Sequence, residues 1–337
     1  MNVDLGVALN ENHFDSLNQT VLEIQNLVSS SAAAVLIIQN GVVVNEWYSG
    51  RHDHSEQSRK VDAKSQFNIG SIRKTYLGFA ISLALQEGRL KGLDDFVSNY
   101  LDDVDDSVIT GTTIRHLLSH THGLYEPLKR MFPAGTNWKY NNAGVNLLIS
   151  IVQKVFDRPL ASVINDEVLR RYGLTETGWR KEQSENLVWV NETYSGEHGG
   201  EANLFASTRD LAYWGYLHLT KGSYQGDQLL PKTIFQRAVE ITTPSSLDDT
   251  LPRNGFFWWV QDRPRSMSEL GQQLPKGSFQ SLGIFGNALL VIPEYNVVAV
   301  RMLNQIERNP EGYNYLKDIQ NFRNKVLECI LSNEILK

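Results

Sequence analysis

The feature that most constrains the fold is an apolar segment that starts with the sequence FNIGSIRK at residues 67–74 and runs to Gly88. After Lys74, apolar residues recur at steps of three and four, which is the spacing of one face of an α-helix, and a glycine commonly ends such a helix. The pattern therefore predicts a buried helix that opens on a Ser-x-x-Lys pair. Its apolar face consists of Leu77, Ile81, Ala84 and Leu85.

The Ser-x-x-Lys pair places a primary amine one helical turn from a hydroxyl, because side chains three residues apart lie on the same face of a helix. Free N–H groups and the dipole at a helix N-terminus also favour negative charge there. Ser71 could therefore lose its proton to Lys74, attack an acyl carbon and have the resulting oxyanion bound by its own N–H. The same Ser-x-x-Lys pair is also common on helices that have no catalytic role, so the surrounding sequence must show whether this pair is catalytic.

The composition excludes several classes of function. Of the 337 residues, 41% are hydrophobic and 21% are charged, as is usual for proteins that bury a full core. The net charge of −6 gives no electrostatic reason to expect binding to nucleic acid or to an anionic membrane. Cys329 is the single cysteine, which excludes an internal disulfide and a multi-cysteine metal site. We expect a buried thiol there, and no cofactor or metal.

The N-terminal residues Met1 to Asp4 do not begin the basic, apolar and small-residue order of a signal peptide. No segment approaches the roughly 18 apolar residues that a membrane span needs. We therefore expect a cytoplasmic protein, or a periplasmic or secreted one if a leader has been removed.

Strand periodicity is concentrated at the two ends of the chain. The pair Asn40-Gly41 joins two apolar runs and suits a type I′ hairpin turn. We expect an α+β fold, in which residues 1–90 and 251–337 form one antiparallel sheet with helices on both faces and residues 91–250 form an inserted, mainly helical domain. Further strands are expected at 256–260, 278–282, 287–292 and 297–303, and the flanking helices at 14–29 and 313–336.

A second candidate element is Tyr140-x-Asn142, on a loop before an apolar helical run at residues 145–156. A lysine ammonium stabilises a neighbouring tyrosine anion, so Tyr140 could serve as a general acid or base. The alternative is an ordinary core tyrosine. The amide of Asn142 could hold the lysine and a substrate carbonyl.

Three histidines, His116, His120 and His122, raise the question of a zinc site. No glutamate joins them in an H-E-x-x-H arrangement, and a helix that runs into a turn does not generally aim all three at one point. We expect structural roles, with His120 hydrogen-bonded at the helix end and His122 beside the cleft.

Together these motifs resemble the serine β-lactamase and penicillin-binding-protein superfamily, in the branch of class C β-lactamases, family VIII carboxylesterases and aminohexanoate-oligomer hydrolases. The resemblance covers about residues 30–305. It rests on Ser71-x-x-Lys74, on Tyr140-x-Asn142, and on the phrases IRHLLSHTHGL at 114–124 and FPAGT at 132–136. It implies the β-lactamase/transpeptidase-like fold, with an acyl-transfer site between the sheet domain and an all-helical domain.

By matching positions, the resemblance implies that Ser71 is the nucleophile, that Lys74 assists its deprotonation and that Tyr140 shuttles the proton. It places the oxyanion between the Ser71 N–H and a backbone N–H near Gly283 and Ile284. Aromatic residues are candidates for an apolar acyl pocket, with core packing as the alternative for each; they are Tyr48, Tyr125, Trp138, Trp258 and Phe285.

One departure from the family pattern bears on the substrate. The family usually carries Lys-Thr-Gly or His-x-Gly on the last strand of the site, whereas this chain has Ser281-Leu282-Gly283. The missing cation helps the lactamases to engage the carboxylate of the drug, so we expect weak or no β-lactamase activity. A shifted alignment would make Lys276 the cation instead.

The sequence therefore predicts a serine hydrolase that cleaves small-molecule esters or amides through an acyl-Ser71 intermediate. Three alternatives stay open: an acyltransferase that uses the same intermediate, a D-amino-peptidase, and a non-catalytic binding protein of the same fold. The sequence leaves undecided the identity of the substrate, the choice between Lys74 and Tyr140 as primary base, and the oligomeric state.

Overall fold

A six-stranded antiparallel sheet joins the two ends of the chain. The computed structural model describes residues 5–10, 12–126, 128–180, 182–188, 198–200 and 202–335, so residues 1–4 lie outside it. Strand β1 pairs with β13, with Ala33 opposite Leu303, and this pairing confirms that the first and last thirds share one sheet. In spatial order the strands are β10 (Trp259–Val260), β11 (Phe279–Gly283), β12 (Asn287–Ile292), β13 (Val297–Leu303), β1 (Ala32–Gln39) and β2 (Val42–Gly50).

The turn between β1 and β2 is the one that the sequence predicts. Asn40 and Gly41 have φ angles of +53° and +76°, and a type I′ turn needs positive φ at both central positions. Asparagine and glycine tolerate that conformation better than other residues, so this pair fixes the hairpin and with it the alternation of side chains along β1.

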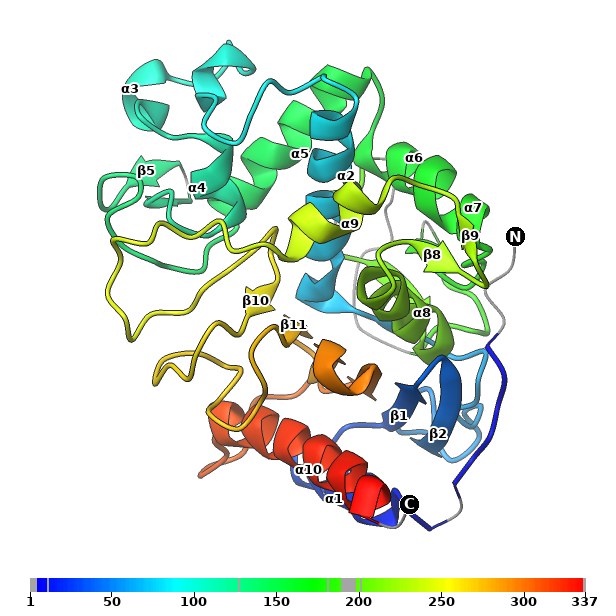
Figure 1. Ribbon diagram of the computed structural model, residues 1–337. Coiled ribbons are helices and arrows are strands. Elements are labelled where there is room, and N and C mark those ends of the chain that lie inside the picture. Colours follow the sequence, from blue (N-terminus) through cyan, green and yellow to red (C-terminus); the bar gives the residue numbers. More distant parts are fainter. Residues whose placement is uncertain are drawn as a thin grey trace.

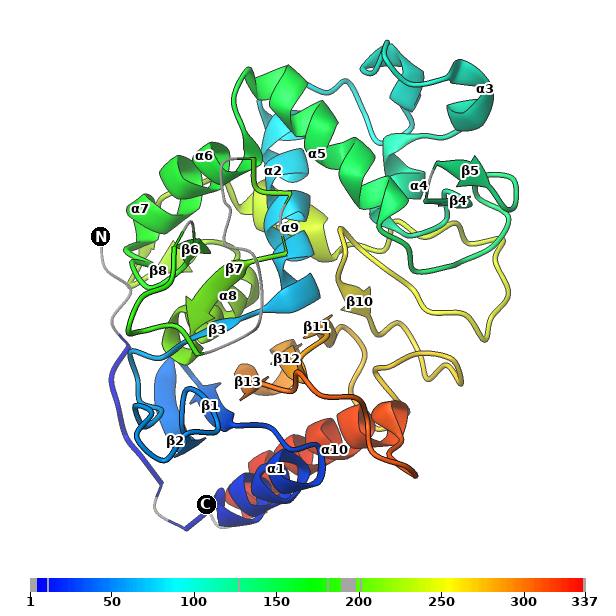
Figure 2. The same ribbon diagram turned by 180° about the vertical axis from the view of Figure 1, so that it is seen from behind.

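Every residue of strand β1 is buried. Because successive side chains point to opposite sides of a sheet, both faces of the strand must be covered. One face meets helices α1 (Asp15–Leu27) and α10 (Tyr315–Ile335), which lie side by side (Figures 1 and 2). The other face meets α8 (Thr208–Leu219), which in turn packs on α2 (Lys74–Gln86) through a stack of Trp214 on Tyr76. Ala33, Val35 and Ile37 enter the first core, and Ala34, Leu36 and Ile38 enter the second. The expected α+β fold is confirmed.

Helix α8 lies within the segment expected to form the insertion, yet it packs against β1, β12 and β13. The domain boundaries themselves stay a prediction.

The other helices and helical turns are η1 (Gly70–Arg73), η2 (Val97–Asn99), α3 (Asp106–Ile109), α4 (Ile114–Leu118), α5 (Ala143–Phe156), α6 (Leu160–Ile164), the π-helical turn η3 (Asn165–Leu169), α7 (Arg170–Tyr172), α9 (Lys232–Val239) and η4 (Pro293–Tyr295). Small sheets are formed by β3 (Gln66–Asn68), β7 (Leu204–Ser207) and β6 (Gly178–Trp179), by β4 (Leu124–Tyr125) and β5 (Lys129–Arg130), and by β8 (Ser223–Tyr224) and β9 (Asp227–Gln228).

Two local expectations are wrong. The predicted strand at 256–260 shrinks to Trp259 and Val260, because the Gly255 N–H donates to the Trp258 carbonyl and Phe257 has a φ of +66°, so the chain turns there. In α1, the helical spacing also predicts Leu27 on the apolar side, but Leu27 is half exposed and Val28 takes that place in the core.

Cys329 is a buried free thiol on α10, as expected. Among the helices that the structure describes, each is too short or too polar to cross a lipid bilayer.

A buried ion pair ties α10 to the sheet. The Arg301 guanidinium on β13 donates two hydrogen bonds to the Asp318 carboxylate, at 2.8 and 3.0 Å, and both side chains are almost fully buried. The Nε atom of Arg301 donates to the carbonyl of Gly286 at 3.0 Å, and the Tyr313 hydroxyl donates to Asp318 at 2.7 Å. This network therefore holds the turn after β11 as well as the last helix.

Replacing Asp318 by Ala is expected to lower the free energy of unfolding by about 3–5 kcal/mol, because it leaves the Arg301 charge buried without its partner. Urea denaturation followed by tryptophan fluorescence measures the loss. The control is Glu328→Ala, which removes an exposed ion pair with Lys325 on the same helix and should cost about 0–1 kcal/mol. Equal losses in the two variants would contradict the role assigned to the buried pair.

Candidate active site

Ser71 lies on a tight turn between a strand and the most deeply buried helix. The Asn68 side chain accepts a hydrogen bond from the Gly70 N–H at 2.8 Å, and Gly70 has a φ of +54°, so the chain leaves β3 and enters η1 within two residues. Helix α2 follows directly. Its Tyr76 ring stacks on Trp214 of α8 at 4.2 Å between centroids. The nucleophile candidate is therefore placed by a rigid helix rather than by a long loop.

Ser71, Lys74 and Tyr140 come together at the start of α2. The Lys74 Nζ atom lies 2.7 Å from the Ser71 Oγ atom and 2.6 Å from the Tyr140 hydroxyl. Lys74 is 3% exposed, while Ser71 and Tyr140 are half-buried and line an open pocket. The amine thus bridges the hydroxyls of two residues that both line the space where a substrate would bind.

The surroundings shift the proton affinities of this trio. Burial, followed by the neighbouring Arg73 charge, lowers the pKa of Lys74 from 10.5 to about 7. Burial raises the pKa of Tyr140 above its usual value of 10. Near neutral pH the amine is therefore the group that can exist without its proton, while the tyrosine keeps its hydroxyl hydrogen.

The end of β11 approaches the backbone of the Ser71 turn closely. A Cβ atom on Gly70 would lie 3.0 Å from the Ile284 nitrogen, and one on Gly283 would lie 2.4 Å from the Ile69 carbonyl oxygen. The Asn287 side chain reinforces the approach, since it donates to the Asn68 carbonyl at 2.7 Å and accepts from the Leu303 N–H at 2.9 Å. The backbone around Ile284 thus lies beside that of Ser71, as two donors to one oxyanion would require.

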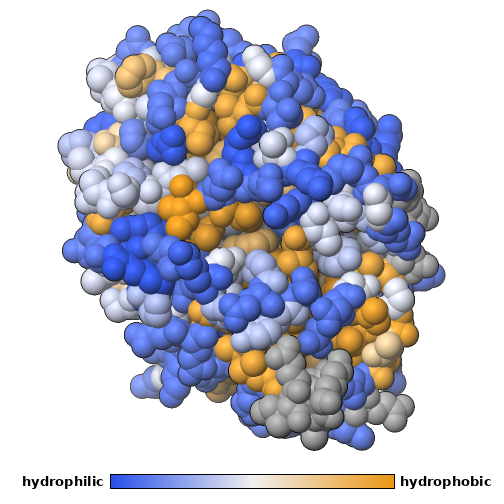
Figure 3. Space-filling view, viewed as in Figure 1, coloured by the Kyte–Doolittle hydropathy of each residue, from blue (hydrophilic) through white to orange (hydrophobic). Residues whose placement is uncertain are grey.

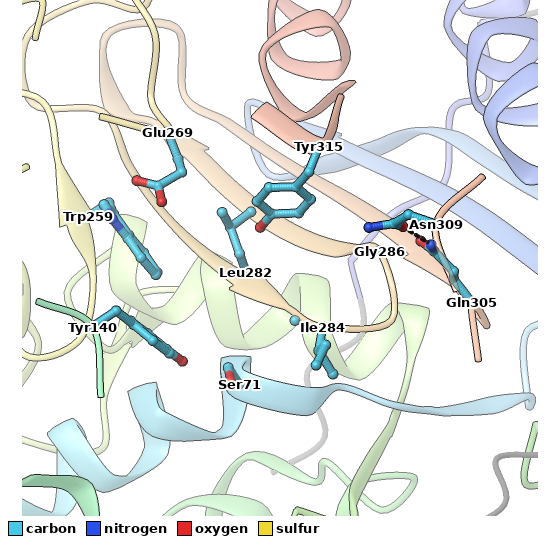
Figure 4. Close-up of a pocket in the computed structure, with 11 residues that line it drawn as sticks. Ser71, Tyr140, Trp259, Glu269, Leu282, Ile284, Gly286, Gln305, Asn309 and Tyr315 are labelled. Carbon is cyan, nitrogen blue, oxygen red and sulfur yellow. Dashed lines mark hydrogen bonds between the residues drawn. The ribbon is translucent and has the colours of Figure 1, made fainter. Parts of the chain in front are cut away.

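A pocket of about 390 Å³ opens at Ser71. This volume is within the usual range for small-molecule sites. In the space-filling view, hydrophobic residues line a hollow in the middle of the face, at the level of β10 and β11 (Figure 3). The pocket is lined by Ser71, Tyr140, Trp259, Glu269, Leu282, Gly283, Ile284, Gly286, Gln305, Asn309 and Tyr315 (Figure 4).

Gly283 and Ile284 line the pocket, but the aromatic residues chosen from the sequence do not. Tyr48 donates a hydrogen bond to Glu46 on the edge strand β2. Phe285 packs against Leu187 and Phe205 instead of facing the pocket.

The other three aromatic candidates also lie outside the pocket lining. Trp258 is fully buried and packs on Phe279 in the core. Tyr125 is half-buried in the small strand β4, and Trp138 donates its indole N–H to Asn254 at 2.7 Å.

Asn142 is exposed at the N-terminus of α5, and the structure gives it no hydrogen bond to Lys74. The side chain that caps the first turn is that of Asn141, which accepts from the Ala143 N–H at 2.8 Å. The expected contact between Asn142 and the lysine is therefore absent from this structure.

Sequence reasoning missed most of the pocket wall. Alternation along a strand sends Trp258 and Trp259 to opposite faces, where they enter two different cores, and only Trp259 also lines the pocket. Tyr315 begins α10, where helical periodicity gives no sign of a pocket. Glu269, Gln305 and Asn309 come from segments without regular structure and had no detectable signal.

The histidines do not form a metal site. His116 accepts a hydrogen bond from the Thr113 N–H at 3.1 Å and caps α4. His120 is buried against the Tyr140 ring at 4.5 Å, and burial lowers its pKa. His122 accepts from the Leu124 N–H at 2.9 Å and is buried, so the expectation that it faces the cleft is wrong. The described residues contain no group of three His, Cys, Asp or Glu side chains that could hold a metal ion.

Comparisons with known proteins show the family and the fold. The family model described as Beta-lactamase matches residues 23–318. An uncharacterized protein of Alkalihalophilus pseudofirmus is 40% identical over 332 residues, which cover 95% of this chain and 98% of that protein.

Two solved structures share the fold. A class C β-lactamase in complex with cefoxitin has a TM-score of 0.76 and 18% identity, over 94% of this chain and 98% of its own. EstCE1, described as a hydrolase with promiscuous acyltransferase activity, has a TM-score of 0.72 and 20% identity, over 91% of this chain and 98% of its own.

The pKa of Lys74 can be measured directly by NMR on protein labelled with ¹³C at the lysine Cε, with Lys74→Met to assign the resonance. We expect a midpoint near pH 7 rather than 10.5, because burial disfavours the ammonium. The unfolded chain keeps this proton up to the ordinary pKa, so the contribution of Lys74 to stability rises with pH between these two values. A midpoint above pH 10 would contradict the burial argument.

Proposed function

The chain belongs to the β-lactamase family, within the superfamily of serine β-lactamases and penicillin-binding proteins, and from that premise we propose that it hydrolyses esters or amides of small molecules through an acyl-Ser71 intermediate. The observation that carries the proposal is the position of the Lys74 amine within hydrogen-bond distance of both the Ser71 and the Tyr140 hydroxyls. Nucleophile, base and proton carrier are then already in contact before a substrate arrives.

In the proposed acylation step, neutral Lys74 accepts the proton of Ser71 while the Oγ atom forms a bond to the acyl carbon. The oxyanion of the tetrahedral intermediate lies between the N–H groups of Ser71 and Ile284. When the bond to the leaving group breaks, Tyr140 donates its proton to the leaving oxygen or nitrogen and regains one from the Lys74 ammonium. The pKa directions of Lys74 and Tyr140 support this division of roles.

Deacylation repeats the steps with water as the nucleophile. The Lys74 and Tyr140 pair removes a proton from the water, whose oxygen attacks the acyl carbon, and returns a proton to the Ser71 oxygen as the ester bond breaks. The products are the free carboxylic acid and the original serine. The whole cycle is assigned to groups of this chain.

We further propose that β-lactamase activity is weak or absent. The described residues that line the pocket include no lysine, arginine or histidine to bind the carboxylate of a β-lactam. Lys276, the other candidate cation, is exposed in the turn before β11 and does not line the pocket.

Acyl transfer is a second candidate, because an alcohol or amine could replace water in the deacylation step. The activity stated for EstCE1 favours keeping this possibility. Adding a primary alcohol to the hydrolysis assay separates the two outcomes, since transfer yields a new ester in place of the free acid.

Ser71→Ala tests the main proposal. Intact-protein mass spectrometry is carried out after incubation with p-nitrophenyl esters of short and medium chain length, D-amino-acid amides and one β-lactam. We expect a Ser71-dependent acyl adduct or product, and a loss of turnover of about 10⁴–10⁶-fold in the variant, because the nucleophile is removed. Turnover by Ser71→Ala near the wild-type level would sink the mechanism, as would the absence of any product from the whole panel.

Gly70→Ala tests the oxyanion site. The new methyl group would press on the Ile284 nitrogen, so we expect kcat for p-nitrophenyl ester hydrolysis to fall about 10²–10³-fold, the effect of losing one oxyanion donor. The control is Gly88→Ala, where φ is also positive, at +70°, but no atom lies within 4 Å of the added Cβ. This control carries the backbone strain without the collision, and an equal loss of activity in both variants would refute the assignment.

A further inference from the structure

The pocket beside Ser71 carries a single formal charge of its own. Glu269 is the one Asp or Glu among the described lining residues, and no lysine, arginine or histidine joins it there. In Figure 4, Glu269 lies beside Trp259, on the other side of the pocket from Ile284, Gln305 and Asn309. The pocket thus presents a negative group at the end away from Ile284, Gln305 and Asn309, and its described lining offers no cation for an anionic substrate.

One oxygen atom of the Glu269 carboxylate has no hydrogen-bond partner within the described protein. Its Oε2 atom is buried and makes no hydrogen bond to any described residue. A buried carboxylate oxygen without a partner is costly, and structural carboxylates are normally satisfied by donors. Asp210 is an example in this chain, since it accepts from the Glu176 N–H and the Thr177 hydroxyl, both at 2.9 Å. Glu269 therefore differs from a carboxylate that serves packing alone.

One cation lies behind the pocket wall. Arg323 on α10 is fully buried and does not line the pocket; one of its Nη atoms donates to the Gln280 side chain. Burial raises the pKa of Glu269, and its own backbone N–H, the charge of Arg323 and the Trp259 side chain oppose that rise. Arg323 and Glu269 form no direct ion pair, so Arg323 favours the ionised carboxylate from behind the wall and leaves the pocket side of Glu269 open.

Aromatic rings line the rest of this end. Trp259 and Tyr140 are nearly parallel, at 14°, with ring centroids 6.0 Å apart, and Tyr315 also lines the pocket. The faces of such rings attract cations, and the attraction is larger where water is excluded. A carboxylate together with tryptophan and tyrosine rings is the side-chain chemistry that binds an organic ammonium group.

We propose that this pocket selects substrates that carry a positively charged amine, and that Glu269, with Trp259 and Tyr315, binds that charge while Ser71 attacks the ester or amide carbon. The inference rests on the proposed hydrolase function and adds a substrate class to it. Glu269 is assigned to specificity and takes no part in proton transfer, because Lys74 already contacts the nucleophile and Tyr140 contacts Lys74.

The test uses two p-nitrophenyl esters of the same shape and different charge. One is the 4-(trimethylammonio)butanoate, and the other is the 5,5-dimethylhexanoate, in which carbon replaces the quaternary nitrogen. For the wild-type protein we expect kcat/KM to be about tenfold or more higher for the cationic ester, the discrimination that a desolvated cation–aromatic and carboxylate site provides. Because the ammonium group is quaternary, its charge does not change with pH.

Glu269→Gln keeps the shape of the side chain and removes its charge. We expect it to lower kcat/KM for the cationic ester about tenfold, mainly through KM, and to leave the neutral ester within about threefold. The matched control is Glu294→Gln, which removes the same charge from an exposed turn after β12, outside the pocket.

A measurement that needs no variant is competitive inhibition of the wild-type enzyme, in which choline should inhibit more strongly than 3,3-dimethylbutanol.

The outcomes separate the two proposals. Equal hydrolysis of both esters by the wild type, or equal effects of Glu269→Gln on both, would overturn the substrate class and leave the hydrolase function standing. Stronger inhibition by 3,3-dimethylbutanol than by choline would do the same. If neither ester gave product or a Ser71-dependent adduct, the proposed function would fail, and this inference with it.

Discussion

The structure depends on a close approach between two backbone segments, the turn at Gly70 and the end of β11 at Gly283. Neither position has room for a side chain, because an added Cβ would collide with the opposing main chain. The approach brings η1 against β11 and β12 of the large sheet, and the pocket opens beside this contact. The two glycines therefore set the distance on which both the nucleophile and the oxyanion donors depend.

Burying the Lys74 amine has an energetic cost that the rest of the fold must offset. A shift of the pKa from 10.5 to about 7 corresponds to about 5 kcal/mol whenever the amine is protonated. This is comparable to the whole stability of many domains. The two hydrophobic cores on either side of β1 offset the cost of burying the amine. The buried Lys74 amine lies where the proposed reaction requires a neutral amine.

Much of the fold could be predicted because regular elements leave a periodic signal. The buried helix after Ser71, the Asn40-Gly41 hairpin and the pairing of the first and last thirds follow from spacing and turn chemistry. The meeting of Lys74 with Tyr140 was inferred from a resemblance, since the two residues are far apart in the chain and no local rule connects them. The pocket wall was largely missed, because Glu269, Gln305 and Asn309 lie in irregular segments. The sequence did not show which face each of the chosen aromatic side chains would occupy. Trp258 is an example, because it is buried in the core while its neighbour Trp259 lines the pocket.

The pairing of β1 with β13 also sets the order in which the site is completed during synthesis. The turn at Ser71 emerges from the ribosome early, whereas Ile284, Gly286 and Tyr315 are made more than two hundred residues later. Until that last part of the chain appears, β1 is paired with β2 alone and lacks β13, and the Gly70 turn lacks the strand against which it packs. The growing chain thus carries a serine and a lysine without a pocket, and the complete site is a property of the finished molecule alone.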